Sequence, residues 1–471
     1  MLSAAATPTG FAESQPTRRP ARCGPSRRAR TWTLVATSLG LAVVQLDVSV
    51  VNVAIKPIGA SLGGGVSSLQ WVVNAYTLAF AAFILTAGAL GDRIGAKRVF
   101  IAGFLLFTAA SATCGLASSM AMLIAARAVQ GMGAAVLVPC SLTLLSHTYP
   151  DAEERIRAVG LWAAGASAAL CAGPLVGGLL TVTLGWRAIF FINAPIGAAG
   201  VLLTARWARE TSRSVGGSVD VWGQLASVAA LTSLAAAMIE GGVHGFGAPP
   251  VIAGFTVAAA AAVTFVTIER RTAHPMLPLG VLRVGAVRAA SLIGLVVNVA
   301  FYGLIFVLSL FFQRTQHLTA LQAGLAFAPM TASVMVANVL ARRLARRTGP
   351  GRTIAAGALL MAAAAVALLG AGSGSAYPAL LGQFLGLGFG LGLIVPVMTA
   401  SLLAGVDRSR SGIASGALNS ARQTGSVIGV ALFGSLIAGG RLVAGLHLAL
   451  VISAGLALAI VALSAGINDR A

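Results

Sequence analysis

Three ionisable side chains interrupt long apolar stretches of the sequence, and they are its first candidates for chemistry. They are Asp47, Arg127 and Arg422. A charge inside a membrane-spanning helix is costly unless it is paired or hydrated, and such residues often mark proton or substrate paths. At a rise of 1.5 Å per residue, Asp47 lies ~21 Å from the predicted inner end of its helix, and Arg127 lies ~12 Å from the predicted outer end of its own. In a hydrocarbon core of roughly 30 Å, both residues therefore lie at similar depths in the outer half. The same arithmetic places Arg422 ~17–20 Å from the inner end of its helix.

Asp47 can exist in two forms whose balance depends on its surroundings. Burial favours the protonated carboxyl, whereas a bound cation or the nearby Arg127 favours the carboxylate. We therefore hypothesise that Asp47 exchanges a proton for a cationic substrate, and that Arg127 and Arg422 belong to the same coupling site. The alternative is a structural ion pair between Asp47 and Arg127 that has no transport role.

The composition indicates what must position these charges. Apolar residues make up 57% of the 471 residues and charged residues only 9%, where a soluble protein has about 25% charged residues. There are too few charges to cover a globule in water. A backbone inside a bilayer must satisfy its own hydrogen bonds, so an all-α integral membrane protein is predicted. No stretch is both long and polar, which excludes a large catalytic domain outside the membrane.

Apolar runs of about 18 residues or more predict the membrane spans. Fourteen such runs occur, and the connections between them are short. The predicted spans are 33–55, 70–91, 98–118, 120–146, 158–181, 189–206, 220–240, 249–268, 289–312, 320–341, 353–373, 377–403, 411–438 and 443–466.

The basic residues predict how these spans are oriented. Lys and Arg accumulate in cytoplasmic loops, and here only Lys56, Arg187, Arg314 and Arg441 fall in the predicted outer segments. Both termini are therefore predicted to be cytoplasmic. Residues 1–31 resemble a transit peptide or signal region in composition, but we expect them to be a disordered basic cytoplasmic leader.

Other classes of partner find little support in the sequence. The net charge of +20 comes from short polar gaps between apolar runs, not from the long basic surface that nucleic acid requires. The four Cys and five His residues have no metal-ligand spacing, so neither a metal site nor a disulfide framework is expected. No Walker motif is present. We expect no cofactor and a proton gradient as the energy source.

A glycine-rich, charged loop follows the second predicted span. Its key residues resemble the signature loop of the major facilitator superfamily, and the resemblance implies a latch in which the carboxylate of the loop faces the N-terminal end of the span that begins near Ser411. A degenerate copy follows span ten, with Arg346 in place of the carboxylate, which indicates an internal repeat. The predicted gating loop comprises Gly88, Asp92, Arg93, Gly95, Lys97 and Arg98.

Further motifs narrow the resemblance to the fourteen-span drug:proton antiporters. Leu123 to Ala135, with the buried Arg127, resembles the fourth-helix motif, and Leu46 to Ala54 resembles the first-helix motif. The stretch from Trp186 to Pro195 is similar to the junction before span six. Small residues in span five also pack helices in any membrane protein, but here they resemble the antiporter motif. That motif comprises Gly160, Gly173, Pro174, Gly177 and Gly178.

The resemblance implies two six-helix bundles, 32–206 and 271–471, separated by two inserted spans in 207–270. It further implies a monomeric transporter in the cell membrane that exports amphipathic, cationic drugs or antibiotics by proton-coupled alternating access. An exporter of an endogenous metabolite, lipid or siderophore is the alternative. A membrane-embedded enzyme for lipid-linked substrates would need a cluster of carboxylates or histidines, which is missing from the sequence. Polar residues within spans are expected either to line a cavity or to join helices by hydrogen bonds: Asn74, Tyr76, Asn298, Asn338, Gln383 and Asn419.

Overall fold

The computed structural model describes residues 26–211, 220–272, 275–372, 374–406, 411–440 and 442–467. These residues form fourteen helical segments that are long and apolar enough to cross a membrane, and each overlaps a predicted span. The prediction of an all-α integral membrane protein is thereby confirmed. The first half comprises α1 (Arg27–Leu62), α2 (Val66–Ile94), α3 (Ala96–Gly115), α4 (Met120–Thr148), α5 (Ala152–Thr183), α6 (Ala188–Phe191) and α7 (Asn193–Trp207). Then follow α8 (Val221–His244), α9 (Pro249–Arg271), η1 (Leu279–Arg283), α10 (Gly285–Leu310), the π-helical turn η2 (Phe311–Thr315), α11 (Ala320–Thr348), α12 (Pro350–Ala367), η3 (Leu368–Gly370), α13 (Tyr377–Ala404), α14 (Ser411–Ala438) and α15 (Leu442–Ser464).

Side chains cap the N-terminal ends of some of these helices, among them α1 and α5. The Ser26 hydroxyl accepts a hydrogen bond from the backbone N–H of Ala29, 3.2 Å away, and α1 therefore begins at Arg27. The helix starts before residue 32, where the first bundle was expected to begin, and residues 1–25 of the predicted leader lie outside the described residues. Asp151 caps α5 in the same way by accepting from the N–H groups of Glu153 and Glu154.

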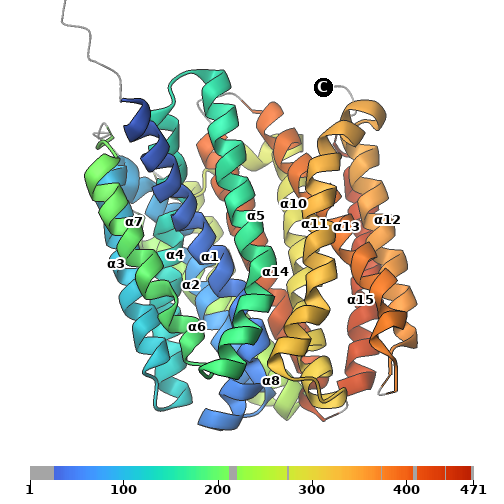
Figure 1. Cartoon of the computed structure of the whole chain (residues 1–471). Coiled ribbons are helices and arrows are strands. Elements are labelled where there is room, and N and C mark those ends of the chain that lie inside the picture. The colour runs from blue at the N-terminus through green and yellow to red at the C-terminus, as the bar shows by residue number, and fades with distance from the viewer. Residues whose placement is uncertain are drawn as a thin grey trace, which may run out of the picture.

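The helices form two groups that lie side by side (Figure 1). Helices α1 to α7 make up one half and α10 to α15 the other. We call the end of the bundle with the connections at 94–96, 148–152 and 348–350 the basic end, and the end with those at 62–66, 115–120, 183–188 and 315–320 the opposite end. The first described helix begins at the basic end, and an even number of spans returns the last one there. That the basic end faces the cytoplasm remains a prediction.

The inserted pair packs over one seam between the halves. Helices α8 and α9 pack against each other, and α8 also packs against α2 and α14. Leu78, Ala235 and Val427, one from each of α2, α8 and α14, form a buried apolar cluster at this junction. The inserted pair therefore contacts both halves.

The two copies of the repeated loop share a backbone conformation. Gly95 ends α2 and precedes α3 with a φ of 110°, and Gly349 ends α11 and precedes α12 with a φ of 91°. Positive φ values of this kind favour glycine, which lacks a Cβ. The equivalent glycines, aligned from sequence, therefore make the same turn in both halves.

The sixth span comprises α6, which ends at Phe191, and α7, which starts at Asn193. Ile192 between them keeps helical backbone angles, with φ −59° and ψ −24°. Pro195 lacks the N–H that would otherwise bond to the Phe191 carbonyl, so one helical hydrogen bond is missing here. Asn193 is fully buried within the first half.

Candidate transport site

Asp47 and Arg127, which the depth arithmetic placed at one level, form a buried ion pair. The distance between Asp47 Oδ2 and Arg127 Nη1 is 2.5 Å, and the side chains are 0% and 1% exposed. Gln130, one turn after Arg127 on α4, accepts from Arg127 Nη1 at 2.8 Å and donates to Asp47 Oδ1 at 2.7 Å. Residues three apart on a helix share a face, so one turn of α4 supplies both partners of the carboxylate.

Residues of α2, α3 and α7 hold this pair in place. Asn193 of α7 donates to Asp47 Oδ1 at 3.2 Å and to the hydroxyl of Ser111 on α3 at 2.9 Å. Arg127 Nε donates to the Val72 carbonyl at 3.2 Å, and the guanidinium lies 4.2 Å from the centre of the Tyr76 ring. Buried charges are tolerated when they are paired and hydrogen-bonded in this way. The pair is thus a neutral unit within the first half.

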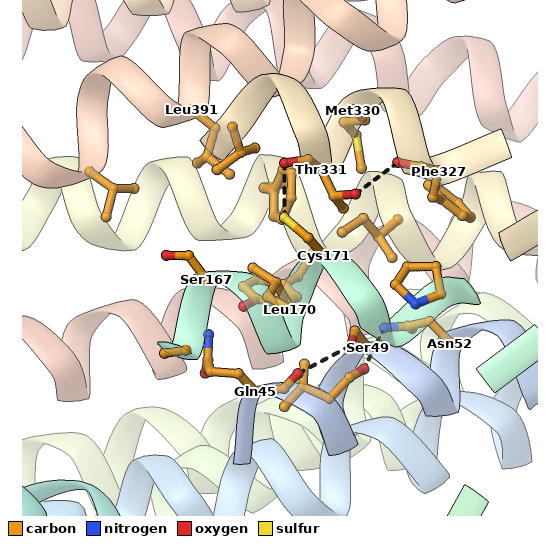
Figure 2. Close-up of a pocket in the computed structure, with 18 of the residues that line it drawn as sticks. Gln45, Ser49, Asn52, Ser167, Leu170, Cys171, Phe327, Met330, Thr331 and Leu391 are labelled. Carbon is orange, nitrogen blue, oxygen red and sulfur yellow. Dashed lines mark hydrogen bonds between the residues drawn. The ribbon is translucent and has the colours of Figure 1, made fainter. Parts of the chain in front are cut away.

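A cavity of about 1070 Å³, including its open mouth, lies between the two halves. Figure 2 shows side chains from α1, α5 and α11 that face this space. The lining is mostly apolar, and none of its residues is acidic. Its polar members are Gln45, Ser49, Asn52, Ser167, Cys171, Asn298, Tyr302, Thr331, Asn338 and Arg422.

Helix α1 presents different residues to the cavity and to the ion pair. Gln45, Ser49 and Asn52 line the cavity, and their spacing of three to four residues puts them on one face. Asp47, two residues after Gln45, is rotated by about 200° from it and faces α4 instead. Asp47 and Arg127 are therefore outside the cavity lining, and Arg422 is inside it.

The predicted polar liners divide in the same way. Asn298 and Asn338 line the cavity. Tyr76 is buried against Arg127, and Asn74 is buried with no hydrogen-bond partner for its amide among the described residues. Gln383 and Asn419 are not among the lining residues either, and Asn419 instead donates to the Ser415 carbonyl at 3.1 Å.

The glycines of the predicted antiporter motif lie where helices approach closely. A Cβ on Gly173 would collide with the Ser49 hydroxyl of α1, and one on Gly177 would lie 2.9 Å from the Cα of Val50. A Cβ on Gly178 would lie 2.7 Å from the Cα of Leu321 on α11, in the other half. A Cβ on Gly324 of α11 would in turn collide with the carbonyl oxygen of Pro174 on α5. Gly160 differs, because a Cβ there would meet nothing within 4 Å.

Contacts between the halves concentrate towards the opposite end. Lys56 Nζ donates to the Gln313 carbonyl at 2.6 Å, and the Ser309 hydroxyl donates to the Asn52 carbonyl. Gln70 Nε2 donates to the carbonyls of Val430 and Ala431 at 3.0 and 2.8 Å. Helices α5 and α11 lie close together near this end and apart at the basic end (Figure 1). The cavity is therefore closed towards the opposite end.

The predicted gating loop is held by a carboxylate that the motif does not contain. Glu210 accepts from the Lys97 backbone N–H at 3.0 Å, and its other oxygen lies 3.5 Å from Arg98 Nε. Thr211 accepts from the Ala96 N–H at 2.9 Å, and Lys97 Nζ donates to the Ala205 carbonyl at 2.8 Å. The first turn of α3 is thus capped by the segment after α7. The only signal for this cap in the sequence is that Glu210 is a single acidic residue in a segment rich in arginine.

The carboxylate predicted to act as the latch is free in this conformation. Asp92 and Arg93 are both exposed at the basic end. Asp92 forms no hydrogen bond or ion pair with any described residue. Gly88 makes ordinary contact with α4, because a Cβ on this glycine would lie 3.7 Å from the Cβ of Pro139. The released Asp92 agrees with the separation of α5 and α11 at this end.

Comparison with known proteins places this geometry in a family. The family model described as Major Facilitator Superfamily matches residues 37–430. The methylenomycin A resistance protein of Streptomyces coelicolor is 37% identical over 86% of this chain and 85% of its own length. The multidrug resistance protein Stp of Mycobacterium tuberculosis is 37% identical over 87% of this chain and 76% of its own.

The fold also matches a solved structure. A bacterial homologue of the human lysosomal transporter Spinster, in an inward-facing and occupied conformation, superposes with a TM-score of 0.66 at 16% identity. The match covers 93% of this chain and 97% of that one. The chain is therefore a multi-pass membrane transporter of the Major Facilitator Superfamily, related to drug and antibiotic resistance proteins, and not an enzyme.

Proposed function

We propose that this protein exports small amphipathic molecules, such as antibiotics or other drugs, across the cell membrane by proton-coupled alternating access. The observation that carries the proposal is the mostly apolar cavity between the halves, closed at one end and bordered by helices of both. Binding sites between the repeats of such transporters are exposed alternately to the two sides of the membrane. The names of the resistance relatives support an outward direction.

Alternating access requires that contacts at one end form as those at the other break. In this conformation the hydrogen bonds of Lys56 and Gln70 join the halves at the opposite end, while Asp92 is free at the basic end. In the alternative conformation Asp92 would engage the N-terminal end of α14, where the helix dipole favours a carboxylate. The predicted latch is therefore a feature of the state in which the basic end is closed.

Proton coupling is proposed to act through α1. Protonation of Asp47 removes the counter-charge of Arg127, leaving a buried guanidinium that must find other partners. Because α1 carries Asp47 on one side and Gln45, Ser49 and Asn52 on the other, a shift of α1 towards or away from α4 also changes the cavity wall. Proton and substrate would then compete through the position of one helix and not for one carboxylate.

The test uses purified protein in liposomes that are acidic inside. An antiporter inserted in the inverted orientation accumulates substrate as protons leave. Uptake of ethidium and of 1-naphthalenesulfonate is measured by fluorescence, and proton efflux by trapped pyranine. We expect uptake of at least one probe that nigericin abolishes. Uptake of neither probe, or uptake unaffected by nigericin, would contradict the proposal.

Coupling through Asp47 is tested with two variants and a control. Asp47→Asn should lose gradient-driven uptake. The double variant Asp47→Asn, Arg127→Gln restores neutrality, so it should fold well and still fail to couple. Glu240→Gln neutralises a half-exposed carboxylate that pairs with His244 at 3.2 Å, and should transport normally. Full coupled uptake by the double variant would show that the ion pair is only structural.

A further inference from the structure

We infer that the cavity selects organic anions, with Arg422 binding the acidic group. This inference rests on the proposed exporter function, because it names the chemical class of the exported molecule. It departs from the cationic substrate expected from sequence. That expectation relied on Asp47 reaching the substrate, whereas its carboxylate is turned towards α4 and bonded to Arg127, Gln130 and Asn193.

Arg422 is the charged residue of the cavity wall. The lining includes no Asp, Glu, Lys or other Arg. Arg422 forms no ion pair with any described residue, and its Nε is buried without a hydrogen-bond partner among them. A guanidinium at this depth is costly unless an anion or water compensates it. The cavity thus contains a positive charge whose natural complement is a negatively charged ligand.

Arg127 and Arg422, the two arginines deep within predicted spans, differ in whether a carboxylate compensates their charge. Arg127 is neutralised by Asp47 at 2.5 Å and shielded completely, with 1% of its side chain exposed. Arg422 has no such carboxylate and is partly exposed, on the cavity wall. The fold therefore compensates one guanidinium internally and leaves the other available to a ligand. A planar guanidinium binds a carboxylate or sulfonate through two parallel hydrogen bonds.

The surroundings of Arg422 fix its position. Its aliphatic stem lies against Gly294 of α10, where a Cβ would come within 3.0 Å of the Arg422 Cγ. Asn298, one turn further along α10, lines the same wall, and its amide nitrogen is occupied by the Gly294 carbonyl at 2.7 Å. Tyr302, another turn on, also borders the cavity. One stripe of α10 thus combines a seat for the guanidinium with neutral polar groups.

The remaining wall suits the apolar body of such a ligand. Phe301, Ile305, Phe327, Met330 and Val334 provide apolar surface opposite or beside the polar stripe. Phe327 and Met330 extend from α11 in Figure 2. Aromatic and thioether groups adapt to flat hydrophobic ligands. The predicted ligand is therefore an amphipathic anion with one acidic group and an aromatic or aliphatic body.

The test measures binding of three probes that share one ring system. They are 1-naphthalenesulfonate (anionic), 1-naphthalenesulfonamide (neutral) and 1-naphthyltrimethylammonium (cationic). Equilibrium dialysis with the purified full-length protein in detergent gives each Kd. Wild type should bind the sulfonate most tightly. Arg422→Gln should weaken sulfonate binding at least about tenfold, because it removes a charge-assisted contact, and should change sulfonamide binding less than about threefold.

Three further variants make the result specific. Arg422→Lys keeps the charge and should retain part of the preference for the anion. Gly294→Ala crowds the arginine stem and should also weaken sulfonate binding. Arg314→Gln removes an exposed arginine near the opposite end of the same half and should have no effect. Size-exclusion chromatography and thermal melting confirm that each variant is folded.

The inference is overturned if wild type binds the cation as well as or better than the sulfonate. It is also overturned if Arg422→Gln keeps the wild-type preference, or if wild type binds no probe more tightly than Arg422→Gln does. Failure of the exporter function would look different. Arg422-dependent anion binding without gradient-driven uptake would support the cavity assignment and contradict export. Gradient-driven ethidium uptake by a protein that shows no Arg422-dependent preference for the sulfonate would support export and overturn the inferred anion selectivity.

Discussion

Breaking the buried Asp47–Arg127 pair should lower the free energy of unfolding far more than breaking an exposed ion pair of the same length. The exposed pair Glu153–Arg157 has the same 2.5 Å distance, but its side chains are 77% and 72% exposed. A surface pair of this kind contributes ~0.5 kcal/mol or less. Removing one partner of a buried pair leaves an uncompensated charge and costs ~3–5 kcal/mol. Asp47 also accepts from Gln130 and Asn193, so Asp47→Asn disturbs three interactions.

The assay is a double-mutant cycle of unfolding in mixed micelles. Asp47→Asn and Arg127→Gln are made singly and together, and unfolding by sodium dodecyl sulfate is followed by tryptophan fluorescence. Each single variant should lose ~3–5 kcal/mol, and the double variant should recover much of that loss because no charge is left unpaired. The expected coupling energy is therefore ~2 kcal/mol or more, within the range found for contacting residues.

The control cycle uses Glu153→Gln and Arg157→Gln. Its coupling energy should be ~0.5 kcal/mol or less. If the Asp47 and Arg127 variants are additive to within ~0.5 kcal/mol, the two side chains do not stabilise each other, and the reasoning from burial is refuted. The same result would remove the basis for coupling through α1.

Two more predictions concern the close approach of α5 to α11 and the cap at the first turn of α3. Gly178→Leu should abolish transport by forcing α5 away from Leu321 of α11, whereas Gly160→Leu, with open space around its Cβ, should transport normally; substrate uptake by the two variants checks this, and equal losses would contradict the role of close approach. Glu210→Gln should loosen the first turn of α3, which it caps. Hydrogen exchange at residues 95–99 should then become faster, while Glu154→Gln, at an exposed ion pair with Arg30, should leave those amides unchanged.

The membrane spans, and the pairing of two buried charges, could be predicted from the sequence by locating apolar runs and the depth of each charge within them. The spans followed from apolar runs that a bilayer requires, and equal depths of Asp47 and Arg127 anticipated their pairing. Rotation about a helix axis was harder to predict. Helix α2 is apolar on nearly all sides, so periodicity does not show which face meets the cavity. For Asn74 and Tyr76 the sequence consequently left cavity lining and contact between helices both open, and the two side chains are buried within the first half.

Local sequence patterns could not predict which residues far apart in the chain contact each other. Asn193 donates to Asp47 across 146 residues of sequence, a distance that no local pattern spans. Glu210 reaches the gating loop because the chain just after α7 lies against the first turn of α3. In α1, by contrast, the helical spacing of Gln45, Ser49 and Asn52 already separates their face from that of Asp47. This spacing is a signal within the sequence against direct contact between Asp47 and a substrate.

The inserted helices make the two edges of the transporter unequal. At one edge α8 covers the junction of α2 and α14, with Leu78, Ala235 and Val427 sealed between them. At the other edge α5 meets α11, and neither inserted helix packs there in the described part of the chain. If the proposed amphipathic substrate enters sideways from the lipid, we expect it to enter at the edge of α5 and α11, which the inserted helices leave uncovered.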